Sequence, residues 1–203
     1  MSLAAPSAAI LRGDLFFTAG PGSVAELPRP FQVAGRLPRL LDEERPTVAI
    51  LGLGLGAVAA LMIEQRPGMR LIGVEPDEAL AGSIGEPLRS RIELERTDAL
   101  TFLHRTRKRL DLVFDDCFVL EGEDAVRPPE LTRHADLVAR RLSAGGVYVR
   151  NLLPIDGRPI AEQCADVRRR FSHVELRSFR EWENRFVIAA DRPLPGGWRT
   201  RLG

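Results

Sequence analysis

The chain has 203 residues, of which 44% are apolar and 28% are charged, a composition typical of a globular protein with one core. Its 29 basic and 28 acidic side chains give a net charge of +1, so no overall field favours binding to nucleic acid or to an anionic membrane. No apolar run is long enough to cross a bilayer, and the two cysteines show neither metal-ligand spacing nor a disulfide pattern. We therefore expect a cytoplasmic protein with no metal site.

Strands and helices alternate along most of the chain. Residues 1–46 are rich in proline and glycine, and apart from a short strand at residues 14–18 we expect an irregular N-terminal extension there. Five strands are then expected at residues 47–53, 70–75, 91–95, 110–114 and 146–151. The helices that follow them are expected at residues 57–64, 77–87, 98–108, 129–142 and 158–171.

The end of the pattern differs from its beginning. Residues 173–179 and 185–190 form two further strands whose connection is too short for a helical crossover, so they should pair as an antiparallel hairpin. Residues 192–203 are a tail rich in proline and glycine. Residues 47–191 are therefore predicted to be one α/β domain, a doubly wound and mostly parallel seven-stranded sheet ending in a hairpin.

Three alternating glycines, Gly52, Gly54 and Gly56, separate the first strand from the first helix. Glycine permits a tight turn and a close approach of the backbone to a ligand, and the helix that follows supplies unpaired N–H groups. A turn without a ligand could use the same residues, but three glycines at this junction favour binding. The kind of ligand stays open, because Gly52, Gly54 and Ala57 also satisfy a relaxed dinucleotide pattern.

Two acidic residues stand where a nucleoside would need them. Glu75 ends the second strand about 20 positions after the glycines, where a carboxylate accepts from both ribose hydroxyls; the alternative is an exposed strand-end carboxylate. Asp98 follows the third strand and could accept from an adenine amino group, while the N–H of Ala99 donates to a ring nitrogen. Asp98 is equally suited to cap the next helix, and Asp77 is assigned to capping alone.

Asp115 and Asp116 end the fourth strand, at the sheet edge where open α/β folds bind ligands. Successive strand residues point to opposite faces, so only one of the two is expected to face the cleft. We assign Asp116 as the carboxylate that holds or deprotonates an amine nucleophile, and Asp115 to the cofactor-binding residues. Capping or turn roles are the alternative for both.

In their order, these segments resemble spermidine synthases within the class I S-adenosylmethionine-dependent methyltransferase superfamily. The resemblance spans roughly residues 45–190 and rests on residues 48–60, 73–77, 97–99, 111–118, 128–132 and 142–152. The Asp-Cys-Phe and Pro-Pro-Glu-Leu-Thr segments are its more specific parts.

The resemblance implies a Rossmann-like methyltransferase fold that takes S-adenosylmethionine or its decarboxylated form, without a metal. It implies that the three glycines line the methionine or aminopropyl group, that Glu75 binds ribose, and that Asp98 with Ala99 binds adenine. Asp116 matches the first aspartate of the family's Asp-Ser-Ser-Asp segment, the proposed base. The implied partners are a small-molecule acceptor such as an amine and further copies of the chain, since spermidine synthases are usually dimers or tetramers, with a homodimer as one form.

The sequence also departs from that family. Leu55 replaces an aspartate of the glycine turn, and Val119 replaces the second aspartate of the Asp-Ser-Ser-Asp segment. These differences leave methyl and aminopropyl transfer both open, and they leave a non-catalytic binding or scaffold domain as the alternative. An NAD(P)-dependent oxidoreductase is a further alternative, against which the terminal hairpin and the lack of a Tyr-x-x-x-Lys pair both argue.

Overall fold

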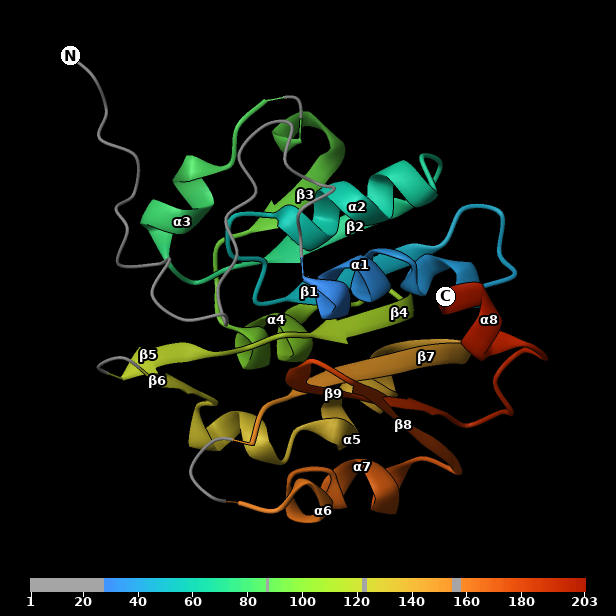
Figure 1. Cartoon of the computed structure of the whole chain (residues 1–203). Helices are drawn as coiled ribbons and strands as arrows, with labels where there is room; N and C mark the ends of the chain where they lie inside the picture. The colour runs from blue at the N-terminus through green and yellow to red at the C-terminus, as the bar shows by residue number, and fades with distance from the viewer. Residues whose placement is uncertain (1–27, 87, 122–123, 155–157) are drawn as a thin grey trace.

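The computed structural model of the protein describes residues 28–86, 88–121, 124–154 and 158–203. A seven-stranded sheet forms its centre, with helices on both faces (Figure 1). The strands are β1 (Thr47–Leu51), β2 (Arg70–Val74), β3 (Ile92–Glu95), β4 (Leu110–Asp115), β7 (Leu142–Leu152), β8 (His173–Phe179) and β9 (Trp182–Ala190). Their order is β3-β2-β1-β4-β7-β9-β8. Strand β9 is antiparallel to both of its neighbours and the other pairs are parallel, which confirms the predicted fold class.

Each face of the sheet has its own hydrophobic core, because successive strand residues point to opposite sides. Val48 and Ile50 of β1 face one core, and Ala49 and Leu51 face the other. The first core, here called the α2 face, is covered by α1 (Arg29–Gly35), the 3-10 helix η2 (Leu37–Leu40), α2 (Ala57–Gln65) and α8 (Trp198–Leu202). The second, the α5 face, is covered by α4 (Ala99–Arg105), α5 (Ala135–Arg141) and α7 (Ala165–Arg170).

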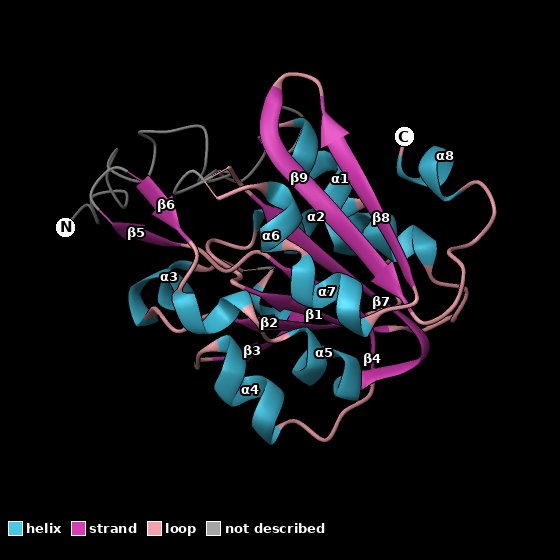
Figure 2. Cartoon of the chain, turned by 90° about the horizontal axis from the view of Figure 1, so that it is seen from below, coloured by secondary structure: helices cyan, strands magenta, loops and turns pink. Residues whose placement is uncertain are grey.

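The terminal hairpin closes one edge of the sheet. Only Arg180 and Glu181 separate β8 from β9, so the two strands must run antiparallel. Figure 2 shows the pair side by side, with α7 and α5 lying over the neighbouring face. Within the described residues no helix is long and apolar enough to span a bilayer.

Both ends of the described chain are more regular than the sequence indicated. Within residues 1–46 we expected irregular chain, but residues 29–40 form α1 and η2, and their apolar side chains are buried against α2. Proline stands at the first or second position of each helix, where its missing N–H costs nothing. The predicted tail contains α8, whose Trp198 and Leu202 join the same core. The strand predicted at residues 14–18 lies outside the described residues.

Two predicted helices are each divided in the structure. The helix expected at residues 129–142 is η4 (Pro129–Thr132) followed by α5, and the one at 158–171 is α6 (Ile160–Gln163) followed by α7. A residue with non-helical dihedral angles stands at each junction, His134 with φ −106° and Cys164 with φ −107°. The connection after β4 contains a small hairpin of β5 (Val119–Glu121) and β6 (Asp124–Val126). The other short elements are α3 (Glu78–Ser83) and η3 (Arg89–Arg91).

Candidate functional site

The glycine turn between β1 and α2 requires glycine at all three predicted positions. Gly52, Gly54 and Gly56 have φ values of 79°, 55° and 83°, a region that other residues adopt only at a cost. A Cβ atom on Gly52 would lie 2.5 Å from the backbone oxygen of Asp116, so the turn packs directly on the chain that follows β4. A Cβ on Gly54 would meet no atom of the described residues within 4 Å. The turn therefore presents bare backbone to open space at Gly54.

Glu75 lies beside this turn and holds it in place. Its carboxylate accepts a hydrogen bond of 2.8 Å from the N–H of Gly54 and one of 3.0 Å from the N–H of Asp77. The side chain is buried, and burial raises the pKa of Glu75 although both N–H donors act against that shift. The structure thus brings the predicted glycines and the predicted acidic residue together at the carboxyl edge of β1 and β2.

Asp77 and Asp98 both cap helices. Asp77 accepts from the N–H groups of Ala79 and Leu80 at the start of α3, which confirms its predicted role. Asp98 accepts a hydrogen bond of 2.9 Å from the N–H of Thr101 in α4, and hydrogen bonds from Thr101 lower the pKa of Asp98. Its side chain is exposed. The methyl group of Ala99 is buried in the core of the α5 face, and adenine contact by Asp98 and Ala99 stays a prediction.

Asp116 stands at the end of β4 and is supported by a polar chain from two other strands. Its carboxylate accepts a hydrogen bond of 2.7 Å from the amide of Asn151 in β7. The amide oxygen of Asn151 in turn accepts one of 3.1 Å from Asn184 in β9. Burial raises the pKa of Asp116 to about 6, against the opposing effects of Asn151 and Arg127. Part of Asp116 is exposed, so it can meet a bound molecule.

Asp115 has entirely different surroundings. It is fully buried, and its carboxylate binds Arg127 at 2.8 Å, the hydroxyl of Tyr148 at 2.6 Å and His134 at 2.9 Å. Burial alone would raise the pKa of Asp115, but the charges of Arg127, His134 and Arg150 outweigh it and hold the pKa well below its usual range. We predicted that Asp115 helps to bind the cofactor, whereas its contacts favour a structural role.

The same polar cluster extends to the helices of the α5 face. Arg150 donates to the Tyr148 hydroxyl and binds both carboxylate oxygens of Asp166 in α7, each at 2.8 Å. Arg127 completes it with a hydrogen bond of 2.9 Å to the carbonyl oxygen of Asn151. Arg127 thus joins the buried cluster on the α5 face of the sheet to Asn151, the residue that supports Asp116 on the α2 face.

Sequence reasoning missed most members of this support. Asn151 was predicted only as the last residue of a strand, although a polar side chain at that position is itself a signal for a site. His134 is buried against Asp115, and no spacing in the sequence indicated that contact. No local pattern singled out Arg127 or Asn184.

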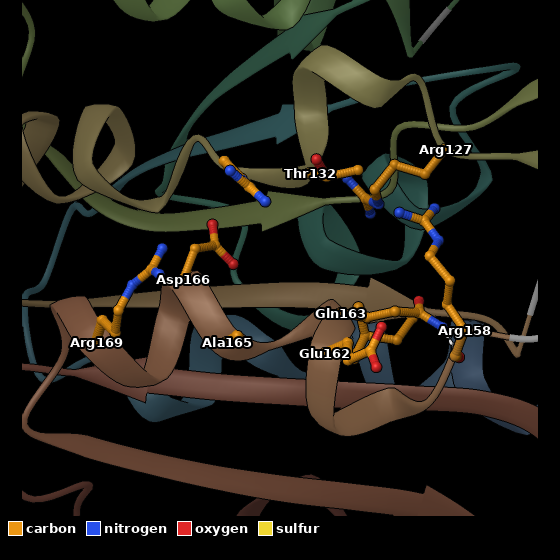
Figure 3. A pocket seen from close by; sticks show the side chains of 10 residues that line it. Arg127, Thr132, Arg158, Glu162, Gln163, Ala165, Asp166 and Arg169 are labelled. Atoms are coloured by element: carbon orange, nitrogen blue, oxygen red, sulfur yellow. Dashed lines mark hydrogen bonds between the residues drawn. The ribbon is translucent and has the colours of Figure 1, made fainter.

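A cavity of about 350 Å³ lies on the α5 face beside the end of β7. One wall comes from the segment between β6 and α5, the other from residues near and within α6 and α7 (Figure 3). The lining residues are Arg127, Thr132, Arg133, Leu152, Arg158, Glu162, Gln163, Ala165, Asp166 and Arg169. No group of three or more His, Cys, Asp or Glu side chains in the described residues is arranged to hold a metal ion.

A sheet of this order, with a glycine turn after β1 and an acidic residue at the end of β2, is the class I S-adenosylmethionine-dependent methyltransferase fold. Human methyltransferase-like protein 13, solved with S-adenosylhomocysteine, has a TM-score of 0.70 and 17% identity, with 86% of this chain and 87% of that chain covered. A probable spermidine synthase from Corynebacterium glutamicum has a TM-score of 0.71 and 21% identity over 89% and 70%.

A third structure with this fold acts on a different kind of substrate. The T. thermophilus 16S rRNA N2 G1207 methyltransferase, solved with S-adenosylmethionine and guanosine, has a TM-score of 0.59 and 20% identity, covering 86% of this chain and 44% of that one. No family model matches the sequence, and a search of curated proteins finds no match. The resemblance expected from the sequence is therefore confirmed for the superfamily fold.

Proposed function

We propose that the protein is a spermidine-synthase-like transferase. It binds S-adenosylmethionine or the decarboxylated form at the carboxyl edge of the sheet and transfers a methyl or aminopropyl group to a small-molecule acceptor. One observation carries this proposal. The backbone at Gly54 is open and is held by Glu75, and Gly52 in the same turn packs against Asp116. A ligand-holding turn and a partly exposed carboxylate of raised pKa are thus neighbours.

The residues present fit an adenosyl ligand. Gly54 leaves room where any side chain would intrude, and α2 begins after Gly56 with no side-chain cap on its first N–H groups. Glu75 is held by two backbone donors, one on each oxygen, and each carboxylate oxygen has a further lone pair for a ribose hydroxyl. Solved structures of this fold contain S-adenosylhomocysteine or S-adenosylmethionine, which supports the same choice of ligand class.

The chain's own residues would mainly align and deprotonate the nucleophile. The adenosyl sulfonium supplies a carbon whose leaving group is a neutral thioether, so positioning is the principal requirement. Asp116 holds the attacking amine and accepts its proton, and a pKa of about 6 leaves this carboxylate ionised at neutral pH. Asn151 fixes the orientation of Asp116, and Asn184 fixes that of Asn151.

A non-catalytic adenosyl-binding domain is the second candidate. Leu55 and Val119 stand where the spermidine synthase pattern has aspartates, and 44% of Val119 is exposed. An NAD(P)-dependent oxidoreductase has weaker support, since its case rests on the relaxed glycine pattern alone. The expectation that no nucleic acid is bound stays a prediction, because one protein of this fold methylates rRNA. A homodimer is likewise still a prediction.

The proposal is tested by isothermal titration with S-adenosylmethionine, its decarboxylated form, 5′-methylthioadenosine and NADH. Tighter binding of S-adenosylmethionine indicates methyl transfer, whereas tighter binding of the decarboxylated form and 5′-methylthioadenosine indicates aminopropyl transfer. Binding followed by no turnover with any amine would favour the non-catalytic domain. Binding of NADH alone would overturn the proposal, as would the absence of all binding.

A further inference from the structure

The cavity beside β7 is lined by an excess of positive charge. Among the described residues of its lining, four arginines face two carboxylates, Glu162 and Asp166. Arg150, which does not line the cavity, donates to both carboxylate oxygens of Asp166. The Oδ2 atom of Asp166 also accepts a hydrogen bond from the N–H of Ala135. Asp166 and Arg127 are thus each paired with a residue outside the cavity lining, Arg150 and Asp115, which leaves Arg133, Arg158 and Arg169 facing Glu162.

One arginine forms a fixed wall of the cavity. Arg127 is buried, with one guanidinium nitrogen on Asp115 and another on the carbonyl oxygen of Asn151. Its guanidinium also lies over the ring of Phe118, 4.9 Å from the ring centre. A guanidinium held in this way is an ordered, planar donor that needs no rearrangement to meet an anion.

The other arginines line the remaining walls. In Figure 3, Arg158 extends from the α6 side and Arg169 lies beside Asp166 at the opposite end. Within the described part of the chain, Arg133 and Arg169 have no ion-pair or hydrogen-bond partner for their side chains. Like charges gathered around one concave space repel one another unless an anion lies between them.

The position of the cavity connects it to the candidate reaction centre. Leu152 lines it, and the preceding residue, Asn151, holds Asp116 on the other face of the sheet. Arg127 contacts both sides, through the Asp115 carboxylate and the Asn151 carbonyl group. The cavity and Asp116 therefore lie on opposite faces of the sheet near the carboxyl end of β7, and Asn151 and Arg127 connect the two.

We propose that this arginine cavity binds a carboxylate or phosphate group of the acceptor, so that the acceptor is an anion-bearing molecule with a nucleophile and not a simple polyamine. The inference depends on the proposed function only in calling the bound molecule an acceptor. Binding of an anion by the cavity is a property that is measured without any adenosyl ligand.

The test is isothermal titration of the full chain with inorganic phosphate, malonate and putrescine. Arg133→Gln and Arg169→Gln are made singly and together, with Arg168→Gln as the matched control, since Arg168 is an exposed neighbour on α7 that does not line the cavity. We expect phosphate or malonate to bind, each single variant to weaken that binding about tenfold, and the control to leave it unchanged. Stronger binding of phosphate than of malonate identifies a phosphate-bearing acceptor, and the reverse order identifies a carboxylate.

Three results would overturn the inference: no anion binding by the wild-type protein, equal binding by the double variant, or an equal loss in Arg168→Gln. Putrescine binding that is unaffected by phosphate would also contradict it. If anions bind as expected but adenosyl compounds do not, the proposed transferase function fails and the anion site stands. If adenosyl compounds bind and anions do not, the opposite conclusion holds.

Discussion

Asn151 donates its side-chain amide to the carboxylate of Asp116 across 2.7 Å, joining the last part of β7 to the end of β4. Asn184 of β9 holds that amide in turn, so a carboxylate at one strand end is oriented by residues from two other strands. Asn151 is therefore a positioning residue for Asp116 in the proposed reaction.

Asn151→Ala should raise the pKa of Asp116 above its value of about 6, because the hydrogen bond that favours the charged form is lost. Carbon-13 NMR titration of the Asp116 carboxyl group measures this directly. Asn184→Ala, which leaves the amide of Asn151 in place, should cause a smaller rise. An unchanged pKa in Asn151→Ala would show that the hydrogen bond does not stabilise the carboxylate.

Asp116→Asn should be more stable than the wild-type protein at neutral pH. In the folded protein the pKa of Asp116 is raised from 3.8 to about 6, so the wild type has its full stability below pH 3.8 and loses part of it as the pH rises through 6. The neutral asparagine avoids that loss, and after allowance for partial exposure the gain is about 1–2 kcal/mol. Urea unfolding at pH 4 and pH 8 checks it; an equal difference at both values would contradict the raised pKa.

Asp115→Asn should destabilise the fold by about 3–5 kcal/mol, because Arg127, His134 and Arg150 lose the buried charge that they surround. Asp191→Asn is the matched control, since it removes only an exposed ion pair with Arg170 and should cost less than about 1 kcal/mol. Since the pKa of Asp115 is lowered in the fold, its contribution is present above pH 3.8 and is lost only at lower pH. Denaturant unfolding measures the loss of stability in both variants. If the two losses were similar, Asp115 would have only a local role.

Glu75→Gln should weaken adenosyl-ligand binding by about 1–3 kcal/mol, since it replaces a charge-assisted hydrogen bond with a neutral one. Glu64→Gln, at an exposed position near the end of α2, is the control that should bind as the wild type does. Calorimetric affinities of the two variants, with circular dichroism to verify folding, provide the comparison. Unchanged affinity in a folded Glu75→Gln protein would remove Glu75 from the binding site.

Gly52→Ala and Gly54→Ala should separate folding from binding. A methyl group on Gly52 would collide with the chain at Asp116, so we expect a stability loss of about 3 kcal/mol or more. At Gly54 the methyl group meets no atom in the part of the chain that the structure describes, and the backbone conformation alone should cost about 1–2 kcal/mol. Adenosyl binding by the folded Gly54→Ala protein should nevertheless fall at least about tenfold, because the methyl group occupies the space in front of the turn. Full binding by that variant would move the ligand away from Gly54.

Local spacing made the first half of the site predictable. The glycines and Glu75 follow neighbouring parallel strands, and this placement predicts that they approach each other at one sheet edge, where Gly54 and Glu75 form a hydrogen bond. Alternation along β4 likewise predicted that Asp115 and Asp116 would not share one face. The predicted alternation of strands and helices also held, because both faces of the sheet are buried and the strands are correspondingly apolar.

Long-range pairing set the limit of prediction. Arg127 contacts Asp115, 12 residues away in the sequence, and Asn184 contacts Asn151, 33 residues away. No periodicity in the sequence indicates such contacts. The helices at residues 29–40 were missed because Pro30, Gly35 and Pro38 suggested irregular chain, whereas proline at the start of a helix is well tolerated.

The sheet order also has a consequence for synthesis of the chain on the ribosome. Strand β9 lies between β7 and β8, so β8 emerges first and has no neighbour in the sheet until β9 follows it. Asn184 belongs to that late strand, and without it Asn151 lacks one of its hydrogen bonds. The nascent chain therefore completes its glycine turn early, and it completes the orienting support of Asp116 only after Asn184 of β9 has been translated.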